Sequence, residues 1–366
     1  MKPMAMAMTA MVALAAGASA RAETAFALDP LFSDGVTFAE GKPMRVFGRG
    51  DGEVTVRIAG RTASARAADG RWCVEFPRPP AADCTYEMTV THGDEVKTVR
   101  DVRVGEVWLI AGQSNMQFKL KDESGYPGNA VDDPGVAWHV SDRPEAGERF
   151  AASNGWQKAA GGVTGDWSAI GWLFARARRR IAGKRVGVVG CYQGASTIQA
   201  WLPAEVADAP RFRLAPEELH GDHKAPKYFW NKAEFLYRRT FLPLAPFSFT
   251  GVVWYQGESN TGPGEGRIYA DLLAEMIATW RRDLRDADLP FLIVGIADFS
   301  WRDDPAWRAI QRAQEGMPLR CRRVVTVPCN ARPQERDQIH PPTKGELAER
   351  LAAAAGKSAE FFGQKR

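Results

Sequence analysis

The sequence lacks three features that would each point to a particular class of protein. The apolar stretch near its start is too short to span a bilayer, so no membrane-spanning helix is expected there. No Cys-x-x-Cys pair occurs, so a zinc site made of closely spaced cysteines is not supported. The 48 Lys and Arg residues nearly balance 44 Asp and Glu residues, with no long basic block. The arginines of residues 176–180 are interpreted as the polar face of a helix, so no nucleic-acid partner is predicted.

Cysteine is also scarce, and its few copies leave the disulfides open. The five cysteines are Cys73, Cys84, Cys191, Cys321 and Cys329. An exported protein can form disulfides, and the pairs nearest in sequence are Cys73–Cys84 and Cys321–Cys329. Sequence alone cannot fix the pairing, and burial as small apolar side chains explains the cysteines equally well.

The first 22 residues have the pattern of a secretory signal peptide. Lys2 gives a positive start, residues 11–16 are apolar, and two small-x-small sites follow within residues 18–22. We therefore expect an exported protein, periplasmic or secreted, that is not bound to the membrane after cleavage. A ragged N-terminus, or a short anchor if no cleavage occurs, is the alternative. Without Lys2 and Arg21 the formal charge falls from +4 to about +2.

Residues 23–103 are predicted to form a small antiparallel β-sandwich domain. Short runs that alternate apolar and polar residues occur at 44–47, 54–58 and 86–90, and turn signals rich in Gly and Asp, at 50–52, 69–70 and 92–94, separate or follow the runs. Such a series of short strands over roughly 80 residues is typical of a sandwich.

From residue 104 to residue 366 the pattern changes to strands that alternate with helices. Strands are expected at 106–111, 185–190, 249–255, 290–297 and 323–328, and helices at 167–182, 267–284, 305–315 and 344–355. Strands that are apolar throughout favour a parallel sheet covered on both faces, so the fold class is α/β. Residues 120–165 and 203–228 are interpreted as long loops. In α/β folds with a parallel sheet, ligands bind outside the carboxyl ends of the strands.

Ser114 follows the first of these strands directly. Residues 107–111 are apolar, Gly112 ends the run, and the serine comes two residues later. A strand that stops abruptly before a helix exposes a hydroxyl at the edge of the sheet, and the serine's own backbone N–H can stabilise an oxyanion. Ser114 is therefore the predicted nucleophile.

The chain has only five histidines, and His340 is the best candidate for the base. Asp337 precedes it by three residues on a loop between the last expected strand and the last expected helix. An aspartate at this spacing can accept the imidazole Nδ1–H and turn Nε2 toward the nucleophile. The pattern alone is common, and its position after the last strand is what favours a catalytic role.

Two more strands end in motifs that suit an oxyanion hole. Gly194 follows the strand at 185–190, and a glycine there lets a backbone N–H approach a ligand, although a simple tight turn explains it equally well. Gln256 follows the strand at 249–255 and can donate from its side-chain amide. Glu258 is interpreted either as a structural ion-pair partner or as a substrate contact.

These motifs resemble the sialate O-acetylesterase family of SGNH-hydrolase carbohydrate esterases. The resemblance lies in residues 112–116 (GQSNM), 254–260 (WYQGESN) and 337–344, and extends over most of residues 28–355. It implies a flavodoxin-like three-layer sandwich and an esterase that uses Ser114, His340 and Asp337 without a metal or other cofactor. It also implies an oxyanion hole made of the N–H groups of Ser114 and Gly194 and the side chain of Gln256. The implied substrate is an O-acetylated carbohydrate, either sialic acid or a plant-type polysaccharide.

Contacts to the sugar are expected from residues near these motifs. Gln113, Asn115, Glu258 and Trp201 are the predicted substrate-binding residues, with Trp201 and Trp230 on candidate rim loops. The family usually has a Trp-Gly-Gly-Thr-like run where this chain has residues 192–195 (YQGA), which leaves the substrate preference open.

Three alternatives stay open at this stage. A general short-chain or lipid esterase would use the same machinery, and a catalytically silent carbohydrate-binding protein would keep only the groove. Residues 220–223 (HGDH) suggest a metal site, but a loop with no helix to fix the spacing makes this weak. The oligomeric state is not determined by the sequence.

Overall fold

The structure is a computed structural model that describes residues 25–141, 155–160, 162–302 and 304–363, with side chains up to residue 357. The expected signal peptide lies outside the described residues. Within the described residues, no helix combines the length and the apolar character needed to cross a bilayer.

The N-terminal part is built from short strands, in chain order β1 (Ala27–Leu28), β2 (Thr37–Ala39), β3 (Met44–Arg49), β4 (Glu53–Ile58), β5 (Arg61–Arg66), β6 (Arg71–Phe76), β7 (Tyr86–His92) and β8 (Glu95–Gly112). One sheet has the order β1-β3-β6, and β5, β4, β7 and the start of β8 pair in a second group. All these pairs are antiparallel, while β2 runs parallel to β8. The strands expected at 44–47, 54–58 and 86–90 lie within β3, β4 and β7.

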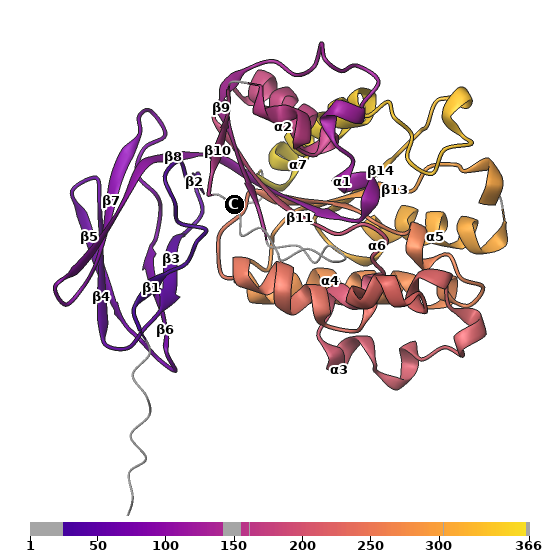
Figure 1. Ribbon diagram of the computed structural model, residues 1–366, viewed down its shortest axis with the longest axis horizontal. Helices are drawn as coiled ribbons and strands as arrows, with labels where there is room; N and C mark the ends of the chain where they lie inside the picture. Colours follow the sequence, from indigo (N-terminus) through magenta and orange to yellow (C-terminus); the bar gives the residue numbers. More distant parts are fainter. Residues whose placement is uncertain (1–24, 142–154, 161, 303, 364–366) are drawn as a thin grey trace, which may run out of the picture.

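Strand β8 belongs to both parts of the molecule. Its first residues pair with β7, residues 103–105 pair with β2, and residues 106–112 pair with strands of the large sheet. The two parts are therefore joined by one continuous strand rather than by a linker (Figure 1).

The rest of the large sheet is formed by β9 (Asp133–Val140), β10 (Gln157–Ala159), β11 (Val186–Tyr192), β12 (Gly251–Tyr255), β13 (Phe291–Gly295) and β14 (Val324–Pro328). The order is β10-β9-β11-β8-β12-β13-β14, with parallel pairing except between β10 and β9. All five strands expected from the sequence are present, while β9 and β10 lie in a segment expected to be a loop. The mixed α/β class is confirmed.

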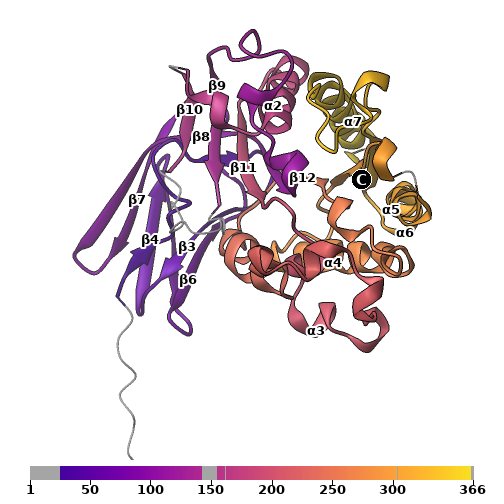
Figure 2. The same ribbon diagram turned by 45° about the vertical axis from the view of Figure 1, so that its right-hand side comes forward.

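Helices cover both faces of this sheet. They are α1 (Ser114–Gln117), α2 (Ala169–Ala182), α3 (Ala204–Ala207), α4 (Tyr269–Asp283), α5 (Pro305–Glu315), α6 (Met317–Arg320) and α7 (Gly345–Gly363). Figures 1 and 2 show α2 and α7 side by side on one face and α4 on the opposite face. The Ser168 hydroxyl caps α2 by accepting a hydrogen bond from the Gly171 N–H, and Gly183 ends this helix in the left-handed conformation.

Burial along the strands follows from this arrangement. Every residue of β11, β12 and β13 is buried, because helices cover both faces of the sheet. All five cysteines are free thiols, and Cys191 is fully buried within β11. Ser114 and the residues that follow β11 and β12 lie at the carboxyl edge of the sheet.

Candidate active site

The turn between β8 and α1 places Ser114 at the sheet edge. Gly112, the last residue of β8, has φ +138°, and a Cβ atom there would lie 2.0 Å from the Tyr255 carbonyl oxygen. Only glycine fits this conformation and this close approach to β12. Ser114 then begins α1, so its side chain emerges where the strand stops.

The structure brings Ser114 and His340 together from opposite ends of the catalytic part. His340 Nε2 lies 2.8 Å from Ser114 Oγ, which is hydrogen-bonding distance for a nucleophile and its base. Burial lowers the pKa of His340, and the nearby positive charge of Lys344 lowers it further. A lowered pKa keeps the imidazole neutral near pH 7, as a proton acceptor must be.

Asp337, the third member of the predicted triad, is not in contact with His340. It is exposed, and between these two described residues no hydrogen bond or ion pair is present. The predicted pairing of Asp337 with the imidazole is therefore not seen in this conformation.

A buried polar network lies behind the nucleophile and holds the loop that carries His340. The side-chain amide of Asn115 donates to the Ile339 carbonyl oxygen at 2.9 Å and to Glu258 Oε1 at 2.6 Å. Lys344 Nζ donates to Asn115 Oδ1 at 2.6 Å and lies 5.0 Å from the ring centroid of Phe118. Asn115 thus connects residues from three separate motifs.

This network corrects the role predicted for Asn115. The residue is 1% exposed and does not line the cavity around Ser114, so it does not contact substrate. Burial lowers the pKa of Lys344 to about 8 and raises the pKa of Glu258, because each charged form loses its hydration. Glu258 Oε2 is buried without a hydrogen-bond partner among the described residues, and Glu258 lines the cavity.

Gly194 lies next to the nucleophile, as the sequence predicts. A Cβ atom on Gly194 would lie 3.7 Å from Ser114 Cβ, so the two residues are neighbours across the sheet edge. The Gly194 N–H donates to Gln117 Oε1 at 2.8 Å. An oxyanion would have to take the place of this amide oxygen.

Gln256 is not placed as an oxyanion donor, and this prediction is wrong. The residue is 0% exposed and is absent from the described lining of the cavity. Its Nε2 donates to the Ser196 carbonyl oxygen at 2.9 Å and to Asn260 Oδ1 at 2.7 Å, and its Oε1 accepts from the Tyr269 hydroxyl. Both amide hydrogens are used in these bonds, so Gln256 holds neighbouring segments of the site together and has no hydrogen to donate to an oxyanion.

Trp201 is likewise not a sugar contact. It is 0% exposed, its ring packs at right angles to that of Trp254, and its Nε1–H donates to Ser196 Oγ at 3.0 Å. Trp230 is buried as well, although it lines the cavity. Gln113 also lines the cavity, and its Oε1 accepts from the backbone N–H groups of Gly257 and Ser259.

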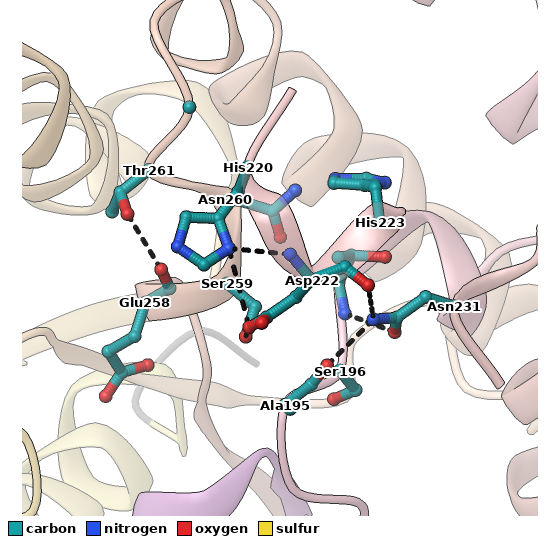
Figure 3. Close-up of polar contacts among 12 residues, drawn as sticks. Ala195, Ser196, His220, Asp222, His223, Asn231, Glu258, Ser259, Asn260 and Thr261 are labelled. Atoms are coloured by element: carbon teal, nitrogen blue, oxygen red, sulfur yellow. Dashed lines mark hydrogen bonds and ion pairs between the residues drawn. The ribbon is translucent and has the colours of Figure 1, made fainter. Parts of the chain in front are cut away.

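The cavity at Ser114 has a volume of about 680 Å³, and its far wall carries a second polar cluster. Ser259 Oγ donates to Asp222 Oδ2 at 2.7 Å, and the Asp222 N–H donates to His220 Nδ1 at 3.2 Å (Figure 3). Burial acts to raise the pKa of Asp222, but hydrogen bonds with His220 and Ser259 outweigh it and lower that pKa.

The suspected metal motif takes part in this cluster instead of forming a separate centre. His223 Nε2 lies 2.7 Å from Glu265 Oε1, while His220 pairs with Asp222. No group of three His, Cys, Asp or Glu side chains within the described part of the chain is arranged to hold a metal ion.

Two features of the site were missed by the sequence. The wall formed by His220, Asp222 and Ser259 was missed because a short His-Gly-Asp-His run was interpreted only as a possible metal ligand set. Trp301, which is 75% exposed at the cavity mouth, was missed because its segment showed neither helical nor strand periodicity. Trp301 comes four residues after the strand expected at 290–297, and this position is the one signal that could have identified it.

Comparisons with known proteins identify related chains. A family described as carbohydrate esterase, sialic acid-specific acetylesterase, matches residues 104–357. A sialate O-acetylesterase from Mus musculus is 24% identical over 84% of this chain and 66% of its own length. The Homo sapiens sialate O-acetylesterase is 26% identical over 61% of this chain and 45% of its own length. This chain thus spans about half to two thirds of these relatives.

A solved structure shows a similar fold. It is a carbohydrate acetylesterase from Xanthomonas citri, with 29% sequence identity and a TM-score of 0.77, and the match covers 92% of this chain and 75% of that one.

Proposed function

The chain belongs to the carbohydrate esterase family of sialic acid-specific acetylesterases, and from this premise we propose that it removes O-acetyl groups from carbohydrates. The observation that carries the proposal is the 2.8 Å separation of His340 Nε2 and Ser114 Oγ beside an open cavity. A hydroxyl at this distance from a neutral imidazole is an activated nucleophile.

The proposed reaction has two steps. Ser114 Oγ attacks the acetyl carbonyl carbon while His340 Nε2 takes the hydroxyl proton, and the tetrahedral intermediate collapses as His340 returns that proton to the departing sugar oxygen. Water then attacks the acetyl-enzyme, again with His340 as base, and acetate leaves. The lowered pKa of His340 suits the base role in both steps.

The oxyanion in this proposal is held by two backbone N–H groups. Ser114 supplies its own, and Gly194 supplies the other once the Gln117 side chain gives up its hydrogen bond. Gln256 has no part in this step, because its amide hydrogens are committed elsewhere.

Asp337 is retained as the group that orients His340 during the reaction. It precedes His340 by three residues, and catalytic hydrogen bonds often form fully only when substrate is bound. Until then the Asn115 hydrogen bond to the Ile339 carbonyl oxygen holds this loop.

The finer assignments of fold and location belong to the same proposal. The order β11-β8-β12-β13-β14 is 2-1-3-4-5 when these five strands are numbered along the chain, which supports a flavodoxin-like catalytic domain. The family match begins at residue 104, which supports a boundary after residue 103 between an N-terminal β-sandwich domain and this domain. Export through a signal peptide over residues 1–22 rests on the leader pattern alone.

The test is acetate release from O-acetylated sialic acid, acetyl-xylan and p-nitrophenyl acetate, with an acyl series up to octanoate. We expect turnover of the acetyl esters and its loss in Ser114→Ala. Ser64→Ala, the same change at an exposed site in the N-terminal part, serves as the matched control and should leave turnover unchanged. Equal turnover by wild type and Ser114→Ala would disprove the serine mechanism, and rates that rise toward octanoate would disprove the acetylesterase.

A further inference from the structure

An exposed aromatic ring lies at the mouth of the catalytic cavity. Trp301 is 75% exposed, whereas most other described tryptophans are buried in the core. It lines the same cavity as Ser114, and the neighbouring Phe299 lines it too. An exposed indole at a cavity mouth offers a flat apolar face to a ligand, since the surrounding protein does not need it for packing.

The inner wall of the cavity is rich in hydrogen-bond acceptors. Glu258 Oε2 and Gln193 Oε1 are both buried without a partner among the described residues, and both residues belong to the cavity lining. Asp222 adds a carboxylate beside Ser259 and His220 on the same wall. Figure 3 shows the Glu258 side chain directed away from the Asp222 cluster, so the two carboxylates present acceptors at separate points. Buried acceptors of this kind call for hydroxyl donors from the ligand.

Fixed positive charge is scarce on this wall. Among the described residues that line the cavity, Arg302 is the one arginine or lysine. Its Nε donates to Asp304 at 2.7 Å and one of its terminal nitrogens donates to the Thr261 carbonyl oxygen at 2.8 Å. Lys344 is buried behind Asn115 and does not line the cavity. A ligand carboxylate would therefore meet the Asp222 carboxylate, the buried carboxyl group of Glu258 and one arginine that is already paired.

We propose that the sugar released by this enzyme is an uncharged glycoside whose ring stacks on Trp301 and whose hydroxyls donate to Glu258, Gln193 and Asp222. This inference rests on the proposed acetylesterase function and names its substrate class. Acidic sugars such as sialic acid are poorer substrates, because their carboxylate adds a like charge to this wall.

The charge part is tested with a matched pair of substrates. O-acetylated N-acetylneuraminic acid and its methyl ester differ in the carboxylate charge and one methyl group, and an acetylated xylo-oligosaccharide represents the neutral class. We expect kcat/KM for the methyl ester to exceed that for the free acid by roughly tenfold, with the oligosaccharide at least as good as the ester. A preference for the free acid would overturn the proposal.

The stacking part is tested with Trp301→Ala and Trp301→Phe. Trp301→Ala should raise KM for the oligosaccharide roughly tenfold, and Trp301→Phe should restore part of the loss. Vinyl acetate, an activated ester without a ring, should be hydrolysed by both variants at the wild-type rate. Leu319→Ala, at a residue that is 94% exposed and outside the described lining of the cavity, is the matched control and should change nothing.

The outcomes separate the two levels of inference. If the wild-type protein does not hydrolyse vinyl acetate, the proposed esterase function is disproved, and so is the substrate class that depends on it. Vinyl acetate turnover together with an unchanged oligosaccharide KM in Trp301→Ala would overturn only the proposal made here.

Discussion

The N-terminal strands and the strands of the catalytic sheet are buried in different ways. Along β4 and β6 every second residue is buried, because one face packs on a core and the other faces water. Along β11 and β12 every residue is buried. The first part is thus packed mainly by apolar side chains, with Arg45 as a buried charged residue, whereas the second carries a group of polar side chains into a covered interior.

The buried polar groups gather where the catalytic strands end. Gln113, Asn115, Gln256, Glu258 and Asn260 are all buried, and each lies within five residues of the end of β8 or β12. Each of them is hydrogen-bonded to residues of another segment. We therefore expect substitutions in the N-terminal part to change stability alone, and those at the sheet edge to affect catalysis, proton affinity and stability together.

The largest contrast is expected between His340→Ala and Trp72→Ala. His340→Ala should lower kcat/KM by roughly 10⁴-fold with little change in melting temperature, because the proton acceptor is lost while the fold is kept. Trp72 is buried in β6, and its replacement by alanine should lower the free energy of unfolding by about 3–5 kcal/mol. The folded fraction of this variant should keep the wild-type kcat/KM. Urea unfolding and acetate release measure both quantities. A loss of kcat in folded Trp72→Ala would contradict the expectation that substitutions in the N-terminal part change stability alone.

Lys344→Met should affect both stability and pH dependence. Removal of this buried cation leaves Asn115 Oδ1 without its donor and removes a charge that favours the ionised form of Glu258, at a cost of about 1–3 kcal/mol. The Lys344 charge also lowers the pKa of His340, so its loss raises that pKa and moves the acid limb of kcat/KM to higher pH. The double variant Lys344→Met/Glu258→Gln should recover stability but keep the shifted limb. An acid limb at the wild-type pH would exclude this electrostatic link.

Asp337→Asn should lower kcat by roughly a hundredfold or more, since an amide cannot fix the imidazole tautomer as a carboxylate does. The melting temperature should not move, because the side chain is exposed. Asp298→Asn, also on a loop outside the described cavity lining, is the control. A wild-type rate in Asp337→Asn would mean that Asn115, through the Ile339 carbonyl oxygen, positions the loop alone.

Gln256→Ala should have the smallest effect on chemistry. It breaks hydrogen bonds to Ser196, Asn260 and Tyr269, and should cost about 1–3 kcal/mol of stability. The value of kcat should fall less than tenfold, whereas loss of an oxyanion donor would lower it by about 10²–10³-fold. A drop of that size in a folded variant would restore Gln256 to the oxyanion hole.

The parts that could be predicted from the sequence are those set by local pattern. Strands β11, β12 and β13 contain no charged residue and are buried over their whole length, which identifies them without knowledge of their neighbours. Strand β9 was missed because Pro134 and Gly135 stand at its start, before the apolar residues, and look like a turn. Its pairing with β11 stabilises it, and sequence spacing does not reveal that partner.

The candidate site divides in the same manner. Ser114 and His340 were predictable because each follows a strand in a distinctive motif, and parallel strands bring such motifs to one edge. Gln256 and Trp201 have suitable side chains in suitable places, but their exposure depends on Tyr269 and Trp280, which come from a helix later in the chain. Motif position predicts which residues gather, and only tertiary packing decides which of them reach the cavity.

The shared strand β8 has a mechanical consequence. Its 18 residues extend over about 60 Å, and the nucleophile comes two residues after its end. A hinge between the two parts would have to break the strand's pairing with β7, β2 or β11. The N-terminal part is therefore rigidly connected to Ser114. Any surface of this part that binds a long polymer is held at a fixed distance from the ester bond that is cut.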